Sequence, residues 1–139
     1  MSLTSINILV VIAAAFIAFI ANFVWFGPLK MYSRWTAALQ QPADHVPGSG
    51  LSTPVLFGLT FASLVIESLV IALVMFGVCD DPSVVNGLGV GLLLGVGVAA
   101  MPSLGHRLFA GQGFKVWIYE VGADVVVAGV MGIVIAALG

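Results

Sequence analysis

Three acidic residues lie within long apolar stretches of the sequence, where a charge is costly. Glu67 occupies the middle of the stretch 55–78, roughly 17 Å from either end at about 1.5 Å per helical residue. Glu120 and Asp124 lie in the stretch 116–138 at a spacing of four, which places both on one face of a helix. A carboxylate at the centre of a bilayer costs at least about 2.5 kcal/mol, and such residues commonly mark ion or proton pathways. We therefore predict a proton or cation site formed by Glu67, Asp124 and Glu120.

The surroundings of these acids decide what chemistry they support. No lysine or arginine lies within the apolar stretches to neutralise them, so the acids are expected to be protonated, to share a proton or to bind a cation. Thr60, Ser63 and Glu67 follow one another at spacings of three and four and form one polar stripe. We expect that stripe to face the interior of a helix bundle or a water-filled cavity, with Glu67 near Asp124.

A purely structural interpretation remains open for the same residues. Glu67 protonated and hydrogen-bonded between helices would need no ligand. Glu120 paired with Arg107 or Lys115 across the predicted loop 105–115 would likewise only stabilise the fold.

Four apolar stretches would position these residues. Each reaches the length of about 20 residues that a helix needs to cross the hydrocarbon core of a bilayer; they cover approximately residues 6–26, 55–78, 84–104 and 116–138. Strands of a membrane barrel are about ten residues long and alternate in polarity, which this sequence does not do. We predict an all-α fold, an integral membrane four-helix bundle, built as a single membrane domain over residues 1–139.

The composition of the chain excludes several classes of protein. Of its 139 residues, 61% are hydrophobic and 7% are charged, against about 25% charged residues in soluble domains. A soluble domain and a disordered chain are therefore both excluded. A net charge of −2 with four basic residues leaves no patch for nucleic acid, and a single cysteine allows no internal disulfide. No motif for nucleotide binding, acyl transfer or metal hydrolysis is present, so we expect neither an enzyme nor a cofactor.

The basic residues predict the orientation in the membrane. All four fall in the segments 27–54 and 105–115, as Lys30, Arg34, Arg107 and Lys115. Lysine and arginine are enriched in cytoplasmic loops. We therefore predict a multi-pass protein of the cell membrane with both of these loops cytoplasmic and both termini outside, together with the turn Asp80-Asp81-Pro82.

A short helix is predicted after the first span. Pro28 is suited to the first turn of a helix, and Met31, Trp35 and Leu39 recur at a spacing of four. This pattern is typical of a helix that lies in the membrane interface.

Small residues at a spacing of four mark the third span. Gly87, Gly91 and Gly95 form a smooth face, and Ala128 and Gly132 repeat the same spacing of small residues in the fourth span. Such faces let membrane helices approach closely. The spacing leaves open whether the packing partner belongs to the same chain or to another copy. Pro102 is expected to end or kink the third span.

The remaining polar residues carry weaker signals. Asn22, inside the first span, is expected to hydrogen-bond between helices. His106 is expected to be an interfacial residue. His45 and His106 do not form a metal site with Cys79, because Cys79 is expected on the other side of the membrane.

The chain resembles a family of small membrane proteins known as domain of unknown function 1761. The resemblance rests on Trp25-Phe26-Gly27-Pro28-Leu29 with the later Trp35, on Phe109, on Trp117-Ile118-Tyr119-Glu120-Val121-Gly122, and on Met131-Gly132. Met31 and Tyr32 stand where the family tends to have Phe-Gly, and Glu120 stands where an aspartate is usual. The resemblance implies four membrane spans and carries no activity with it.

The sequence is compatible with two functions. The first is a small homo-oligomeric transporter or channel, coupled to protons or cations through the buried acids, with an unidentified ion or small molecule as substrate. The second is a structural or accessory protein that packs against partners through its glycine-rich face. The lipid bilayer is the expected partner in both cases.

Overall fold

The structure is entirely helical in its regular elements. It is a computed structural model that describes residues 6–42, 44–45, 48, 50–80 and 82–139. Its helices are α1 (Ile8–Phe26), α2 (Met31–Ala38), α3 (Thr53–Val78), α4 (Val84–Leu94), a π-helical stretch (Gly95–Ala100), α5 (Met101–Phe109) and α6 (Gly113–Leu138). The predicted all-α fold, with a short helix after the first span, is confirmed.

Within the described residues, four helices are long and apolar enough to cross a membrane: α1, α3, the continuous helix Val84–Phe109, and α6. They are consistent with a multi-pass membrane protein. The third helix runs beyond the predicted residue 104, and α6 begins before the predicted residue 116, so the expected loop 105–115 is reduced to residues 110–112. His106 and Arg107 lie in the last turn of α5, where positive charge favours helix continuation.

A π-helical stretch precedes Pro102, the residue expected to end or kink the third span. Gly95–Ala100 forms these wider turns, and Pro102 then occupies the first turn of α5. Proline has no N–H to donate to a preceding carbonyl, and a π-helical turn is a common way to accommodate a changed hydrogen-bond pattern within a helix. The helix continues through Pro102 into α5, so the span does not end there, and of the two expected outcomes the end is wrong.

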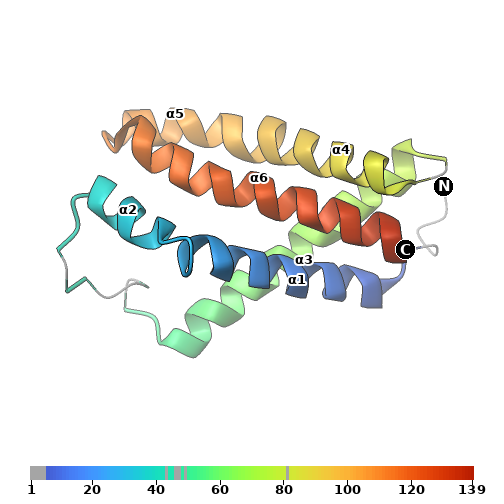
Figure 1. Cartoon of the computed structure of the whole chain (residues 1–139), viewed down its shortest axis with the longest axis horizontal. Coiled ribbons are helices and arrows are strands. Elements are labelled where there is room, and N and C mark those ends of the chain that lie inside the picture. The colour runs from blue at the N-terminus through green and yellow to red at the C-terminus, as the bar shows by residue number, and fades with distance from the viewer. Residues whose placement is uncertain (1–5, 43, 46–47, 49, 81) are drawn as a thin grey trace.

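Helix α6 is the centre of the arrangement, because it contacts α1, α2, α3, α4 and α5. Figure 1 shows α4 and α5 running along one side of α6, with α1 and α2 along the other. Helix α3 crosses behind α1, and its first turns lean away from the other helices. Residues along α6 can consequently meet several elements, and ten of them are buried.

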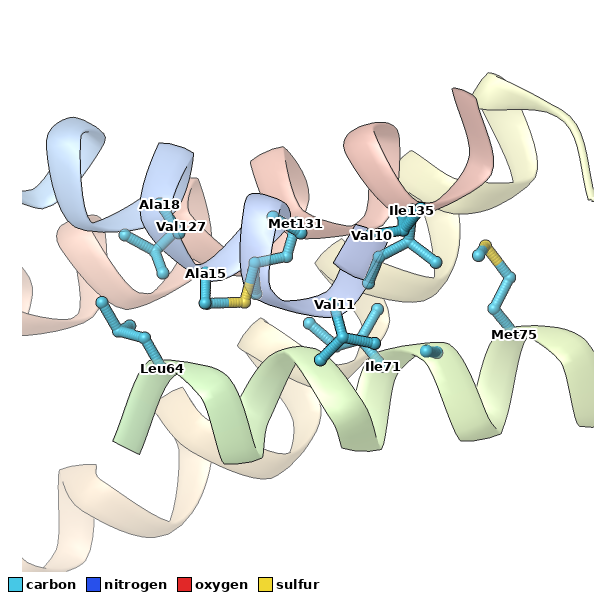
Figure 2. Packing of buried hydrophobic residues seen from close by; sticks show 13 residues of the cluster. Val10, Val11, Ala15, Ala18, Leu64, Ile71, Met75, Val127, Met131 and Ile135 are labelled. Carbon is cyan, nitrogen blue, oxygen red and sulfur yellow. The ribbon is translucent and has the colours of Figure 1, made fainter. Parts of the chain in front are cut away.

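The main core lies where α1, α3 and α6 meet (Figure 2). Its buried residues come from all three helices: Val10, Val11, Ala14, Ala15, Ala18, Leu64, Ile71, Ala72, Met75, Val127, Ala128, Met131 and Ile135. Small residues of α1 let α6 and α3 approach it closely. One hydroxyl is fully buried in this core, that of Ser68, which donates to the carbonyl oxygen of Val11 at 2.9 Å.

The glycine face of the third span packs against α6 of the same chain. A Cβ atom added at Gly87 would overlap the carbonyl group of Gly132, and one added at Gly91 would overlap the carbonyl group of Ala128. At Gly95 an added Cβ would lie 3.0 Å from the Cβ of Ala128. The sequence left open whether this face packs against the same chain or against another copy. In the structure it packs against α6 of the same chain.

The two ends of the bundle differ in charge. Lys30, Arg34, Arg107 and Lys115 belong to the end that carries α2 and the turn between α5 and α6. The start of α1, the end of α6 and the turn that contains Asp80 lie at the opposite end (Figure 1). Asp81 of the predicted turn lies outside the described residues. We call the first of these ends the basic end.

Candidate functional site

Glu120 joins three helices at the basic end. Its Oε1 accepts a hydrogen bond from the indole Nε1 of Trp35 on α2 at 2.9 Å. Its Oε2 lies 2.7 Å from Nε of Arg107 on α5, with exposed side-chain fractions of 17% for Glu120 and 36% for Arg107. Nη1 of Arg107 also donates to Oε1 of Gln112 at 2.7 Å. Of the two partners considered for Glu120, the structure pairs it with Arg107.

All three tryptophans stabilise α6 at this end. Besides Trp35, the indole of Trp25 donates to the carbonyl oxygen of Tyr119 at 3.1 Å, and that of Trp117 donates to the carbonyl oxygen of Ala100 at 2.9 Å. The ring of Trp25 lies directly over Gly122, where an added Cβ would collide with it. Buried tryptophan N–H groups need such partners. These bonds fix α1, α2 and the third span against the turn of α6 that carries Glu120.

Asp124 lies one turn beyond Glu120 on α6, toward the middle of the span. Its side chain is exposed at the surface of the single chain. The face of α6 that points into the bundle is filled by neighbours of Asp124 such as Ala123 and Val127, which are buried.

Glu67 is half-buried in the middle of α3. Within the described part of the chain, neither Glu67 nor Asp124 makes a hydrogen bond or an ion pair. That the two acids form one site stays a prediction. Glu120 differs from both, because its two oxygens are already bonded.

The polar stripe around Glu67 is less enclosed than predicted. The hydroxyl of Thr60 donates to the carbonyl oxygen of Leu56 at 2.9 Å, and that of Ser63 donates to the carbonyl oxygen of Thr60 at 2.7 Å. Both hydroxyls are thus used within α3, and Ser63 is exposed. A hydroxyl in a helix readily bonds the carbonyl of the preceding turn, so spacing alone did not determine which way the stripe faces.

A pocket of about 290 Å³ opens beside Glu120 at the basic end. Its lining comes from α2, the segment after it, α5, the α5–α6 turn and α6: Tyr32, Trp35, Leu39, Gln41, His45, Gly48, Arg107, Gln112 and Glu120. We refer to it as the α2 pocket. The side-chain oxygen of Gln41 is buried and has no hydrogen-bond partner in the described structure.

Sequence reasoning did not identify Trp35, Gln41 or His45 as residues near an acid. The sequence places Trp35 on the predicted interfacial helix and gives His45 no role beyond its exclusion from a metal site. A signal was present for Trp35 alone, since its indole N–H needs a partner once it is buried. Asn22 was expected to hydrogen-bond between helices, yet its Oδ1 is buried without a partner among the described residues.

The residues that the structure describes offer no group of three histidine, cysteine or acidic side chains close enough to hold a metal ion. Cys79, at the end of α3, and His106, exposed on α5, lie at opposite ends of the bundle.

Comparison with known proteins identifies the family. The chain matches no curated protein and no solved structure. A family model described as "Protein of unknown function (DUF1761)" matches residues 9–136, which is nearly the whole chain. The two segments that carry the family resemblance, around Trp25 to Trp35 and around Glu120, are the ones that meet at the basic end. The chain therefore belongs to the DUF1761 family of small membrane proteins.

Proposed function

We propose that this protein moves protons, or a small cation, across the cell membrane through Glu67, Asp124 and Glu120, which we call the carboxylate row. The observation that supports the proposal is geometric: helix α3, which carries Glu67, packs against α6, which carries Glu120 and Asp124 one turn apart. The row leads from the middle of α3 to the basic end of the bundle.

The state of the two inner acids supports this function. Glu67 and Asp124 have no bonding partner in the described part of the chain, although a carboxylate in the middle of a membrane costs at least about 2.5 kcal/mol. Binding a proton or a cation removes that cost. The function is not enzymatic, since the row transfers a proton or a cation without making or breaking a covalent bond.

The exposure of Asp124 supports action as a homo-oligomer. A carboxylate that reaches the surface of a single chain at this depth would face lipid. A second copy placed over this face would cover Asp124 and complete a polar path. The basic end, with all four lysines and arginines, is then cytoplasmic, and the opposite end lies outside.

The alternative is an accessory protein that binds partners through the glycine-rich face. That face is occupied by α6 of the same chain at Gly87, Gly91 and Gly95. An accessory role would therefore have to use another surface.

Proton flux into liposomes tests the proposal. Purified protein is reconstituted with a pH-sensitive dye inside the vesicles, and a pH step is applied with a potassium diffusion potential. Glu67→Gln keeps shape and hydrogen bonding but cannot ionise, so flux should fall to the rate of protein-free vesicles. Asp124→Asn should lower the flux less.

The matched control is Asp80→Asn, since Asp80 is an exposed acid in the turn at the opposite end. It should leave the flux unchanged. All three variants should keep the thermal unfolding temperature of the parent in detergent. If Glu67→Gln carries the same flux as the parent, the carboxylate row has no role in transport and the accessory function is favoured.

A further inference from the structure

The α2 pocket brings a cavity directly to the outermost acid of the carboxylate row. Glu120 forms part of its wall together with Arg107 and Gln112, α2 contributes Tyr32 and Trp35, and Leu39 follows directly after that helix. The hydrogen bond from Trp35 and the ion pair with Arg107 hold the Glu120 carboxylate in place at this wall. The cavity therefore ends at a titratable group whose position is fixed.

The polar lining of the pocket suits water. Gln41, His45, Arg107 and Gln112 all contribute to its wall, and the volume of about 290 Å³ corresponds to on the order of ten waters at about 30 Å³ each. The buried Oε1 of Gln41 has no partner in the described structure. Buried polar atoms of this kind are usually satisfied by ordered water, which can donate to that oxygen.

A second cavity continues the polar space along α2. It measures about 250 Å³ and shares Tyr32, Gln41 and His45 with the α2 pocket. Ser33 and Thr36 of α2 add hydroxyl groups to its wall. Because the two cavities adjoin at three residues, water has room on both sides of the C-terminal half of α2.

We propose that the α2 pocket is an aqueous vestibule through which protons or small cations pass between the water at the basic end and Glu120. This inference rests on the proposed transport function and adds its route of access. Helix α2, besides lying in the interface, forms the outer wall of the vestibule. Blocking the cavity should then block transport without touching any acid.

Cysteine labelling combined with flux tests the vestibule. The background is Cys79→Ser, which removes the one native cysteine. Leu39→Cys places a thiol in the wall of the α2 pocket. Ala110→Cys is the matched control, because residue 110 is exposed in the turn at the same end and outside the pocket. A small cationic methanethiosulfonate is added to both sides of reconstituted vesicles, and labelling is read by mass spectrometry.

Both cysteines should be labelled, and labelling should stop proton flux in Leu39→Cys while leaving it unchanged in Ala110→Cys. Reducing the mixed disulfide should restore the flux. A thiol at residue 39 that resists the reagent, or full flux after complete labelling, overturns the vestibule. If flux is unaffected by labelling but abolished by Glu67→Gln, the vestibule is wrong and the carboxylate row stands. If the unlabelled background protein carries no flux, the proposed function itself fails.

Discussion

Glu120 illustrates how one side chain serves several elements. It accepts a hydrogen bond from Trp35 on α2 and forms an ion pair with Arg107 on α5. Removing one partner of a buried charged hydrogen bond is costly, because the other partner is left unsatisfied. This residue therefore stabilises the basic end in addition to any role in transport.

A double-mutant cycle measures the bond between Trp35 and Glu120. Trp35→Phe removes the donor and Glu120→Ala removes the acceptor, so each should lower the free energy of unfolding, and the double variant should lose less than the sum. The expected coupling is about 1.5–3 kcal/mol, the range for a hydrogen bond to a charged group. Reversible unfolding in mixed micelles gives the free energies of the parent, the two single variants and the double variant.

The control cycle replaces Trp35→Phe with Ser68→Ala. The hydroxyl of Ser68 on α3 bonds to the carbonyl of Val11 in the first turn of α1, toward the end of the bundle opposite Glu120. Its effect should add to that of Glu120→Ala within about 0.5 kcal/mol. Strict additivity in the Trp35 cycle would mean that the Trp35–Glu120 hydrogen bond contributes nothing to stability.

Among the elements, the pair of α4 and α6 depends most on the absence of side chains. The helices approach so closely at Gly87 and Gly91 that a methyl group has no room beside the carbonyls of Gly132 and Ala128. Close approach of this kind replaces the hydrophobic effect as a source of helix association within a membrane.

Alanine substitutions test this packing on a single helix. Gly91→Ala should lower the thermal unfolding temperature, because its methyl group would overlap the backbone of Ala128 and force α4 away from α6. Gly89→Ala, two residues away, meets open space and should leave that temperature unchanged. Unfolding of both variants is monitored by circular dichroism in detergent. Equal unfolding temperatures would contradict the close contact between α4 and α6.

At the scale of the whole molecule, the two ends of the bundle are chemically distinct. The basic end carries every lysine and arginine, a polar pocket and the tryptophan hydrogen bonds, while the other end carries the exposed acid Asp80. The proposed carboxylate row extends from the basic end to Glu67 in the middle of α3.

The difference between the ends predicts the orientation in the membrane. In the Cys79→Ser background, Ala110→Cys at the basic end should resist a membrane-impermeant maleimide in intact cells and react once the cells are lysed. Asp80→Cys at the opposite end should react in intact cells, because the basic end is expected to be cytoplasmic. The reverse pattern of labelling would invert the predicted topology.

The sequence by itself determined the class of the protein and the number of its spans. Four stretches of about 20 apolar residues can satisfy their backbone in lipid only as helices, and the regularly spaced glycines Gly87, Gly91 and Gly95 marked the closely packed face. These properties are local, since they depend on residues a few positions apart. The acids Glu67, Asp124 and Glu120 were identifiable for the same reason: a charge within an apolar stretch is conspicuous.

Only the tertiary structure decided what these residues meet. Trp35 and Glu120 are separated by 85 residues, and Trp25 and Tyr119 by 94, and no sequence periodicity relates them. The exposure of Asp124 and the use of the Thr60 and Ser63 hydroxyls within α3 follow from how each helix is rotated about its axis. That rotation is set by side chains packing between helices, as at Gly122 beneath Trp25, and periodicity along one helix does not specify which neighbour each face will contact.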